Sequence, residues 1–386
     1  MVPIITTPRL IAVGGGALAE LPGLLGRFGL KAPLFVTDSF IARSGMLDRA
    51  RSLLESAGIV SQVFSDTVPD PTTAAVEDGV ARLGEGQFDS LVALGGGSSI
   101  DTAKGMSVLA ANGGKMRDYK VPNEISKAGL PIIAIPTTAG TGSEVTRFTV
   151  ITATETDEKM LIAGLSCCPL AAIVDYELTL TMPLRLTADT GIDSLTHAIE
   201  AYVSQRANPY TDGLAKNAMG LIARHIRTAC RRPDDRPARE AMMLGATTAG
   251  MAFSNASVAL VHGMSRPIGA FFHVPHGLSN AMLLPEITAF SAPAALERYA
   301  DCARAMGVVE EGEGSQSAVA RLLDELRRLN ADLEVPTPKA YGIDRARYDA
   351  LLPVMASQAI ASGSPANNPR VPTQDEIIAL YERVYG

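Results

Sequence analysis

The chain lacks the excess of positive charge that is typical of proteins that bind nucleic acids or anionic membranes. Its 386 residues include 34 lysines and arginines against 41 aspartates and glutamates, and the formal net charge is −7 at pH 7. The lysines and arginines do not gather into a cluster that would suggest an anionic surface as a partner. We therefore expect small-molecule partners, no nucleic acid and no membrane.

Cysteine and long apolar runs are also scarce. The four cysteines show no C-x-x-C spacing, and the adjacent residues Cys167 and Cys168 are poorly placed to bridge each other. No stretch approaches the roughly 18 to 20 apolar residues that a membrane helix needs. The opening "MVPIITTPRLIAVGGG" has no basic segment followed by a long apolar one. We expect reduced thiols and a cytoplasmic protein.

Apolar residues are plentiful, at 47% of the chain, and the first half arranges them in short runs between helical patterns. Uninterrupted apolar runs separated by helices predict βαβ units and a parallel sheet with both faces covered. The runs are residues 32–38, 61–66, 90–97 and 130–138.

The pattern changes near Arg185, after which the sequence is mostly helical. A chain of this length also exceeds one ordinary core. We predict an α/β protein with two domains. Residues 1–185 would form a Rossmann-like parallel-sheet domain, and residues 186–386 an all-helical domain.

A glycine-rich turn follows one predicted strand in "LVALGGGSSIDTAKG", where a helix is expected from Asp101. Glycines allow a ligand to approach the backbone closely, and free N–H groups at a helix N-terminus attract phosphate. Gly96, Gly97 and Ser98 are therefore candidates for a pyrophosphate site. A tight turn, with Ser98 or Ser99 capping the helix, is the alternative.

Two further polar positions follow predicted strands. Asp38 ends "LFVTD", where a carboxylate can accept hydrogen bonds from a ribose and would repel the 2′-phosphate of NADP. An N-cap for the next helix is the competing interpretation of Asp38. The loop "IPTTAGTGSEVT" follows another strand, so both loops would lie at the carboxyl edge of the sheet, where such folds bind ligands.

The chain has only five histidines, and three of them lie in "VHGMSRPIGAFFHVPHGLSN". A separate helical segment places Asp193 and His197 at i and i+4, on one face of the helix. Together with His262 and His276 this pair forms a set of three nitrogens and one oxygen, which suits Zn(II) or Fe(II). A plain hydrogen bond between Asp193 and His197 is the alternative.

Several long motifs occur together across nearly the whole chain: "GGGSSIDTAKG", "PTTAGTGSEVT", "DSLTHAIEAY", the histidine-rich segment and the closing "NNPR". In this order they resemble the iron-containing (group III) alcohol dehydrogenase family, and within it lactaldehyde and 1,3-propanediol reductases. The resemblance implies an N-terminal nucleotide-binding domain, a helical metal-binding domain and an active site between them.

The resemblance also implies roles for individual residues. It assigns the metal to Asp193, His197, His262 and His276. It assigns the dinucleotide to Asp38, Gly96, Gly97, Ser98, Asp101, Thr137, Thr138, Thr141, Lys159 and Leu180. It assigns the substrate channel to Phe148 and Phe253, and it places His273 beside the nicotinamide as a candidate for proton transfer.

One position departs from the motif of many relatives, because Arg266 in "HGMSRP" replaces a second histidine. An unpaired guanidinium is costly to bury, so Arg266 must meet a protein carboxylate, solvent or an anionic substrate. We therefore weigh a structural arginine against one that holds a carboxylate, sulfonate or phosphonate on a short aldehyde.

The predicted function is that of a metal-dependent alcohol dehydrogenase, which transfers hydride reversibly between NAD(H) and a short primary alcohol or aldehyde. The resemblance implies Fe(II), although Zn(II) accepts the same ligands, and a homodimer or larger homo-oligomer. The alternatives are a superfamily member similar to dehydroquinate synthase or glycerol dehydrogenase, and a non-catalytic sensor of a dinucleotide or metal.

Overall fold

The computed structural model describes residues 2–386, which divide into two units. One unit comprises Ile5–Thr181, and the other comprises Met182–Gly386 together with residues 2–4. The predicted domain boundary at residue 185 lies close to this division. Each unit is described by itself below.

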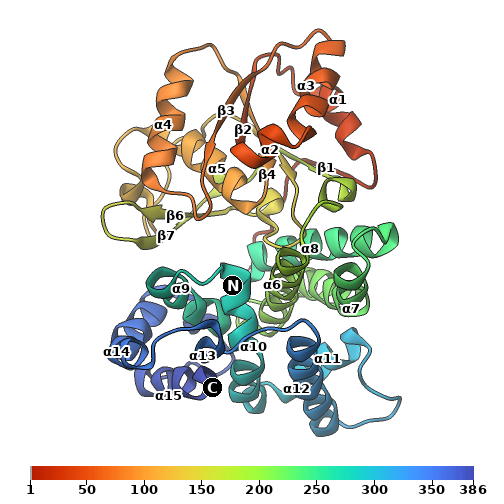
Figure 1. Ribbon diagram of the computed structural model, residues 1–386, viewed down its shortest axis with the longest axis vertical. Coiled ribbons are helices and arrows are strands. Elements are labelled where there is room, and N and C mark those ends of the chain that lie inside the picture. Colours follow the sequence, from red (N-terminus) through yellow and green to blue (C-terminus); the bar gives the residue numbers. More distant parts are fainter. Residues whose placement is uncertain (1) are drawn as a thin grey trace. The chain divides into compact units, whose positions relative to one another are not determined.

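A six-stranded sheet forms the centre of the first unit (Figure 1). Its order is β1-β8-β5-β4-β2-β3, and every neighbouring pair is parallel. Its strands are β1 Leu10–Val13, β2 Pro33–Asp38, β3 Gln62–Thr67, β4 Ser90–Gly95, β5 Ile132–Pro136 and β8 Ala171–Val174. The α-helices of this unit are α1 Leu21–Arg27, α2 Ser39–Arg43, α3 Met46–Ser56, α4 Thr73–Gly84 and α5 Gly97–Asn112.

Both faces of this sheet are covered, as the apolar runs predict. Along β2 the side chains alternate, so Leu34 and Val36 join the core beneath α4 and α5, whereas Phe35 joins the core beneath α1 and α3. All three side chains are fully buried. A strand buried on both faces has no polar side, and this is why the runs read as continuous in the sequence.

An antiparallel hairpin in the first unit was not among the predicted elements. Strands β6 Phe148–Ala153 and β7 Glu158–Ala163 pair in register from Phe148 with Ala163 to Ala153 with Glu158. Ile151 and Met160 extend the core that α4 and α5 form on the sheet. The strands alternate buried and partly buried residues, which is typical of a sheet with one covered face.

The second unit is helical, as predicted from Arg185 onward. Its central helix is α6, which is buried along nearly its whole length and contacts α7, α8 and α10. The α-helices are α6 Leu184–Val203, α7 Pro209–Arg231, α8 Arg236–Ala256, α9 Leu260–Phe272, α10 His276–Ser291, α11 Leu296–Met306, α12 Ser315–Asp332, α13 Pro338–Tyr341, α14 Arg345–Ala361 and α15 Gln374–Tyr385.

None of the helices described over residues 2–386 is by itself long and apolar enough to cross a membrane. Helices α8 and α9 satisfy the criteria of length and composition only as a joined pair, and a bend of 104° separates them.

Candidate functional site

Three of the four predicted metal ligands come together in the helical unit. Asp193 on α6, His262 on α9 and His276 at the start of α10 each offer one ligand atom, and these atoms lie within 4.8 Å of one another. Asp193 Oδ1 lies 3.5 Å from His262 Nε2 and 3.9 Å from His276 Nε2. Burial acts to raise the pKa of Asp193, but the three neighbouring histidines hold that pKa well below its usual range. The carboxylate is therefore ionised, as a metal ligand must be.

Gly277 allows α10 to approach α6 closely enough to bring His276 to Asp193. A Cβ atom at Gly277 would lie 2.5 Å from the backbone oxygen of Asp189 and 3.3 Å from the Cβ of Asp193. Any other residue would push the two helices apart. The glycine that follows His276 in the sequence is thus part of the geometry of the ligand set.

The fourth predicted ligand, His197, lies beside this group. Its Nε2 is 3.9 Å from Asp193 Oδ1, and its ring stacks on that of His262 with centroids 4.5 Å apart. The ring of Phe253 also stacks on the ring of His197, with centroids 4.2 Å apart. Aromatic packing therefore fixes the imidazole plane of His197 next to the ligand group.

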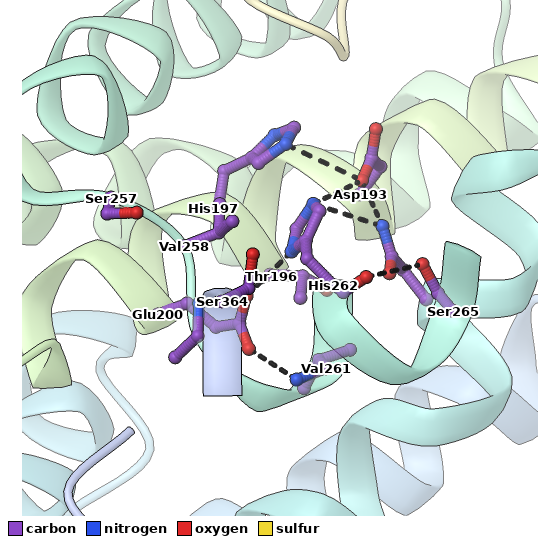
Figure 2. Close-up of polar contacts among 12 residues, drawn as sticks. Asp193, Thr196, His197, Glu200, Ser257, Val258, Val261, His262, Ser265 and Ser364 are labelled. Atoms are coloured by element: carbon purple, nitrogen blue, oxygen red, sulfur yellow. Dashed lines mark hydrogen bonds and ion pairs between the residues drawn. The ribbon is translucent and has the colours of Figure 1, made fainter. Parts of the chain in front are cut away.

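Glu200 orients His262 and was not predicted (Figure 2). Its Oε2 lies 2.6 Å from His262 Nδ1, and the same carboxylate accepts hydrogen bonds from the backbone N–H groups of Ala259 and Val261. Because Nδ1 donates to Glu200, Nε2 carries the lone pair that faces Asp193. The spacing of Asp193, His197 and Glu200 at i, i+4 and i+7 on one helix was the available sequence signal.

Asn280 is a second residue of this centre that the sequence did not identify. It is fully buried on α10, and its Nδ2 lies 2.7 Å from Asp193 Oδ1, 3.1 Å from His262 Nε2 and 3.3 Å from His276 Nε2. The amide N–H groups of Asn280 thus face acceptor atoms from α6, α9 and α10. Its spacing from His276, again i and i+4, places both side chains on one face of α10.

In the first unit, the glycine-rich turn and the threonine loop touch each other. Gly96 is the N-cap of α5, and Gly97 begins the helix. A Cβ atom at Gly97 would lie 2.8 Å from Thr141 Cγ2, and one at Gly96 would lie 3.4 Å from Thr138 Cγ2. The two predicted nucleotide loops are therefore neighbours, as expected for the carboxyl edge of one sheet.

The structure contradicts the alternative interpretation, in which Ser98 or Ser99 caps this helix, and the expected helix start at Asp101. Helix α5 begins four residues before Asp101, so Ser98 and Ser99 lie inside it, and its N-cap Gly96 makes no side-chain capping bond. Ser99 instead forms a hydrogen bond with Thr67. Gly95, which we had not singled out, has φ of 155° and would bring a Cβ atom to 2.4 Å from Ser99 Oγ. The uncapped first turn leaves backbone donors for an anion.

Asp38 is an N-cap in the structure. Its Oδ1 accepts hydrogen bonds from the backbone N–H groups of Phe40 and Ile41, at the start of α2. Its Oδ2 points the other way, 3.6 Å from the Cβ position of Gly95 in the glycine-rich turn. The cap uses one oxygen and leaves the second near the predicted pyrophosphate site, so contact with a ribose stays a prediction.

A buried lysine fastens the threonine loop to α5. Lys104 has no solvent exposure, and its Nζ donates to backbone and hydroxyl oxygens of Ser143 and Thr146 and to the backbone oxygen of Phe148. Burial lowers the pKa of Lys104, an effect that Asp101 opposes. Asp101 accepts from Ser143 Oγ at 2.6 Å and from the Val150 N–H at 2.9 Å. Both of its oxygens thus have protein partners.

The remaining predicted residues are distributed over both units. In the first unit, Lys159 on β7 pairs with Asp70 at 2.9 Å, and Leu180 follows the short helix Tyr176–Thr179. Thr137 follows β5 and is buried. In the second unit, His273 is exposed and ends α9 in the left-handed region, with φ of 53°.

Arg266 lies on α9, four residues after His262. Its Nη1 donates to Ser364 Oγ at 2.9 Å. Within residues 2–386, no carboxylate lies within 4.0 Å of its guanidinium nitrogens.

Comparison with known sequence families matches both units. Residues 8–176 match the family described as iron-containing alcohol dehydrogenase, and residues 187–385 match the C-terminal part of the Fe-containing alcohol dehydrogenase family. Together the two matches cover most of the chain.

Individual relatives align over nearly their whole length. The chain is 37% identical to the NAD-dependent methanol dehydrogenase of Bacillus methanolicus, over 97% of each protein. It is 37% identical to the NADPH-dependent butanol dehydrogenase of Clostridium saccharobutylicum, over 98% of this chain and 97% of the relative. The crystal structure of a 1,3-propanediol oxidoreductase superposes with a TM-score of 0.96 at 35% identity, over the full length of both chains.

Proposed function

The chain belongs to the iron-containing alcohol dehydrogenase family, and we propose that it interconverts a short primary alcohol and its aldehyde with NAD(H) and one divalent metal ion. The observation that carries this proposal is the convergence of Asp193, His262 and His276 from three helices, with Glu200 aligning one imidazole. A dehydroquinate-synthase-like reaction and a non-catalytic sensor are less well supported, since the relatives named above are alcohol dehydrogenases or oxidoreductases.

The donor set suits the ion that the family name implies. One carboxylate oxygen and imidazole nitrogens are ligands that both Fe(II) and Zn(II) accept, so Asp193, His262 and His276, with His197 beside them, would hold the ion. When bound, the ion supplies Lewis-acid polarisation of the substrate oxygen. Glu200 would keep Nε2 of His262 turned towards the ion, and Asn280, which donates to Asp193 Oδ1, would hold that carboxylate in place.

The first unit would bind the dinucleotide, whose nicotinamide supplies or accepts the hydride. The uncapped turn at Gly96, Gly97 and Ser98 offers backbone N–H groups to the pyrophosphate. Thr138 and Thr141 line the same turn, and Oδ2 of Asp38 is available to a ribose hydroxyl. Thr137, Asp101, Lys159 and Leu180 complete the proposed cofactor-binding residues.

Substrate and proton contacts complete the proposal. Phe253 presents an apolar ring beside His197, and Phe148 is proposed as a second residue of the substrate channel. His273, three residues before His276, is exposed, and we propose it as the residue that takes part in proton transfer. The protein atoms thus position the reacting groups and move the proton.

The test is a panel of short aldehydes assayed with NADH and NADPH on protein reconstituted with Fe(II) or Zn(II). We expect metal-dependent oxidation of NADH. His276→Ala should lose both bound metal and turnover, whereas His225→Ala on α7, outside the ligand group, should keep both. Turnover by metal-free protein contradicts the metal assignment, and NADH binding without turnover of any aldehyde favours the sensor.

We also propose a cytoplasmic homodimer or larger homo-oligomer. The four cysteines carry free thiols, which agrees with a reducing compartment. The oligomer is an expectation from the family resemblance. Light scattering on purified protein and fractionation of cells that express the chain test the two statements.

A further inference from the structure

We propose that Arg266 binds an anionic group at the far end of the substrate, so that the preferred substrates are short aldehydes or alcohols bearing one carboxylate or sulfonate. This proposal rests on the function proposed above and narrows its substrate class. The Arg266 guanidinium has fewer protein acceptors than a structural arginine of the same unit.

Arg239 shows what a structural arginine looks like in this helical unit. It is buried, and each of its side-chain nitrogens has an acceptor: Nε donates to Pro233 O, Nη1 to Thr187 Oγ1 and Nη2 to Met182 O. The protein therefore satisfies this guanidinium with three neutral oxygens, and no ligand is needed.

Arg266 has one acceptor where Arg239 has three. Its Nη1 donates to Ser364 Oγ, and its Nε and Nη2 donate to no group of residues 2–386. Burial lowers the pKa of Arg266, with a partial opposing effect of Glu200. A guanidinium stays charged in proteins. Arg266 is only partly buried, so these two nitrogens remain open to an anionic partner, which could form a charge-assisted bidentate contact.

Glu200 cannot serve as that partner. Its Oε2 accepts from His262 Nδ1 and from the Ala259 N–H, and its Oε1 accepts from the Val261 N–H. These bonds hold the carboxylate against the metal ligand His262 and the first turn of α9. Glu200, whose negative charge acts on Arg266, is therefore already engaged by other donors.

The position of Arg266 relates it to the reacting end of the substrate. His262 and Arg266 are four residues apart on α9, so their side chains leave the same side of the helix, displaced by about 6 Å along its axis. A substrate whose oxygen reaches the metal ligands would have its other end roughly one helical turn away. This separation suits a chain of a few carbons between the carbonyl and the anion.

Ser364 is itself held firmly, so Arg266 has a fixed support. A Cβ atom on Gly263 would lie 2.8 Å from Pro365, which shows how closely the segment Ser364–Asn367 packs on α9. Asn367 ties the same segment to Ser257 and to the backbone oxygen of Val258. A preformed donor loses little freedom on binding an anion.

The single positive charge of Arg266 also limits the negative charge that the bound anion can carry. One guanidinium neutralises a carboxylate or sulfonate, whereas a phosphonate dianion would retain unbalanced negative charge in a partly buried place. We therefore place phosphonates below carboxylates and sulfonates in preference.

The experiment compares kcat/KM for succinate semialdehyde and sulfoacetaldehyde with kcat/KM for butanal and propanal, on metal-loaded enzyme with NADH. We expect wild-type enzyme to favour the acidic aldehydes by about tenfold or more. Arg266→Met should remove this preference mainly through KM, since the contact exists in ground and transition states alike. Arg266→Lys should keep part of it, because the charge remains and the planar fork is lost.

Arg347→Met is the matched control, since Arg347 is exposed and donates to the Phe271 carbonyl near the end of α9. This variant should behave as wild type towards all four aldehydes. Equal use of acidic and neutral aldehydes by the wild type overturns the proposal. So does an equal loss of activity towards both classes in Arg266→Met, which identifies a structural arginine.

Calorimetry with propionate and ethanesulfonate separates this proposal from the function on which it rests. If wild-type enzyme reduces no aldehyde, the proposed function fails, and anion binding alone then decides the role of Arg266. Binding that disappears in Arg266→Met supports the anion site, and binding that is absent from the wild type or unchanged in the variant overturns it.

Discussion

Replacing Glu200 by glutamine is expected to weaken metal binding about 10- to 100-fold while leaving the fold intact. The substitution preserves the volume of a buried side chain that is 3% exposed. It removes the charge and turns one of the two acceptor oxygens into an N–H donor. The size of the resulting loss of stability follows from the hydrogen bonds that Glu200 accepts.

The carboxylate receives three donors, from Ala259 N at 3.0 Å, Val261 N at 2.5 Å and His262 Nδ1 at 2.6 Å. A glutamine offers one oxygen, so at least one of these donors would face an N–H group. A buried donor without a partner costs about 1–3 kcal/mol, and the lost charge at the start of α9 costs about 0.3–1 kcal/mol more. The free energy of unfolding should therefore fall by roughly 1–4 kcal/mol.

The effect on the metal is distinct from this general destabilisation. Without the carboxylate, His262 can rotate or change tautomer, and its Nε2 lone pair is no longer held towards Asp193. A 10- to 100-fold weaker affinity corresponds to about 1.4–2.7 kcal/mol. Metal-loaded Glu200→Gln should thus lose more stability than the metal-free variant, by about this amount.

The assay is competition between the protein and a chromophoric chelator for Zn(II), with thermal unfolding of loaded and metal-free protein in parallel. Glu286→Gln is the control, because Glu286 lies on α10 in the same unit and forms a long ion pair of 3.7 Å with Arg327. Wild-type Zn(II) affinity in a destabilised Glu200→Gln would refute the reasoning. Glu200 would then stabilise the start of α9 without orienting a ligand.

Three further predictions concern the first unit and the cysteines. Lys104→Met should lower the free energy of unfolding by about 3–5 kcal/mol and raise KM for NADH, because Asp101 and the oxygens of Ser143 and Thr146 lose their buried cation. A melting temperature equal to that of the wild type and of the exposed control Lys127→Met would contradict this prediction. Asp38→Ser keeps a capping oxygen for α2 and removes the charge, so NADPH use relative to NADH should rise about tenfold; a wild type that already prefers NADPH would show that Asp38 is only a cap. Burial raises the pKa of Cys167 to about 12 and that of Cys230 to about 11, so their thiolate fractions at pH 8 are roughly 10⁻⁴ and 10⁻³. Iodoacetamide at that pH should modify the partly buried Cys168 first, as mass spectrometry of native protein can show, and fast labelling of Cys167 would be inconsistent with its burial.

Local patterns in the sequence were sufficient for the layout of the chain. The uninterrupted apolar runs of β2, β4 and β5 predicted a parallel sheet because strands covered on both faces carry no polar side. The change to helical periodicity near Arg185 identified the second unit. The motifs around Gly96 and His262 indicated the family, which the comparisons confirm.

The same local patterns were insufficient where a residue could act in two ways. Asp38 could be read as a cap or a ribose ligand, and only the position of Phe40 and Ile41 against its Oδ1 showed the cap. Ser98 could be a helix cap or a pyrophosphate ligand, and the start of α5 at Gly97 excludes the cap. Such choices depend on where a helix starts, and sequence patterns locate helix ends least well.

The supporting residues of the site became visible only in the tertiary structure. Glu200 reaches His262 across 62 positions of sequence, and Asn280 reaches Asp193 across 87. Lys104 meets its acceptors about 40 positions away, and Ser364, the acceptor for Arg266, lies 98 positions along the chain. A carboxylate, amide, ammonium or guanidinium looks the same in any sequence. What it does is decided by the donors, acceptors and burial that packed helices bring to it, because a buried polar group must find its partners in space.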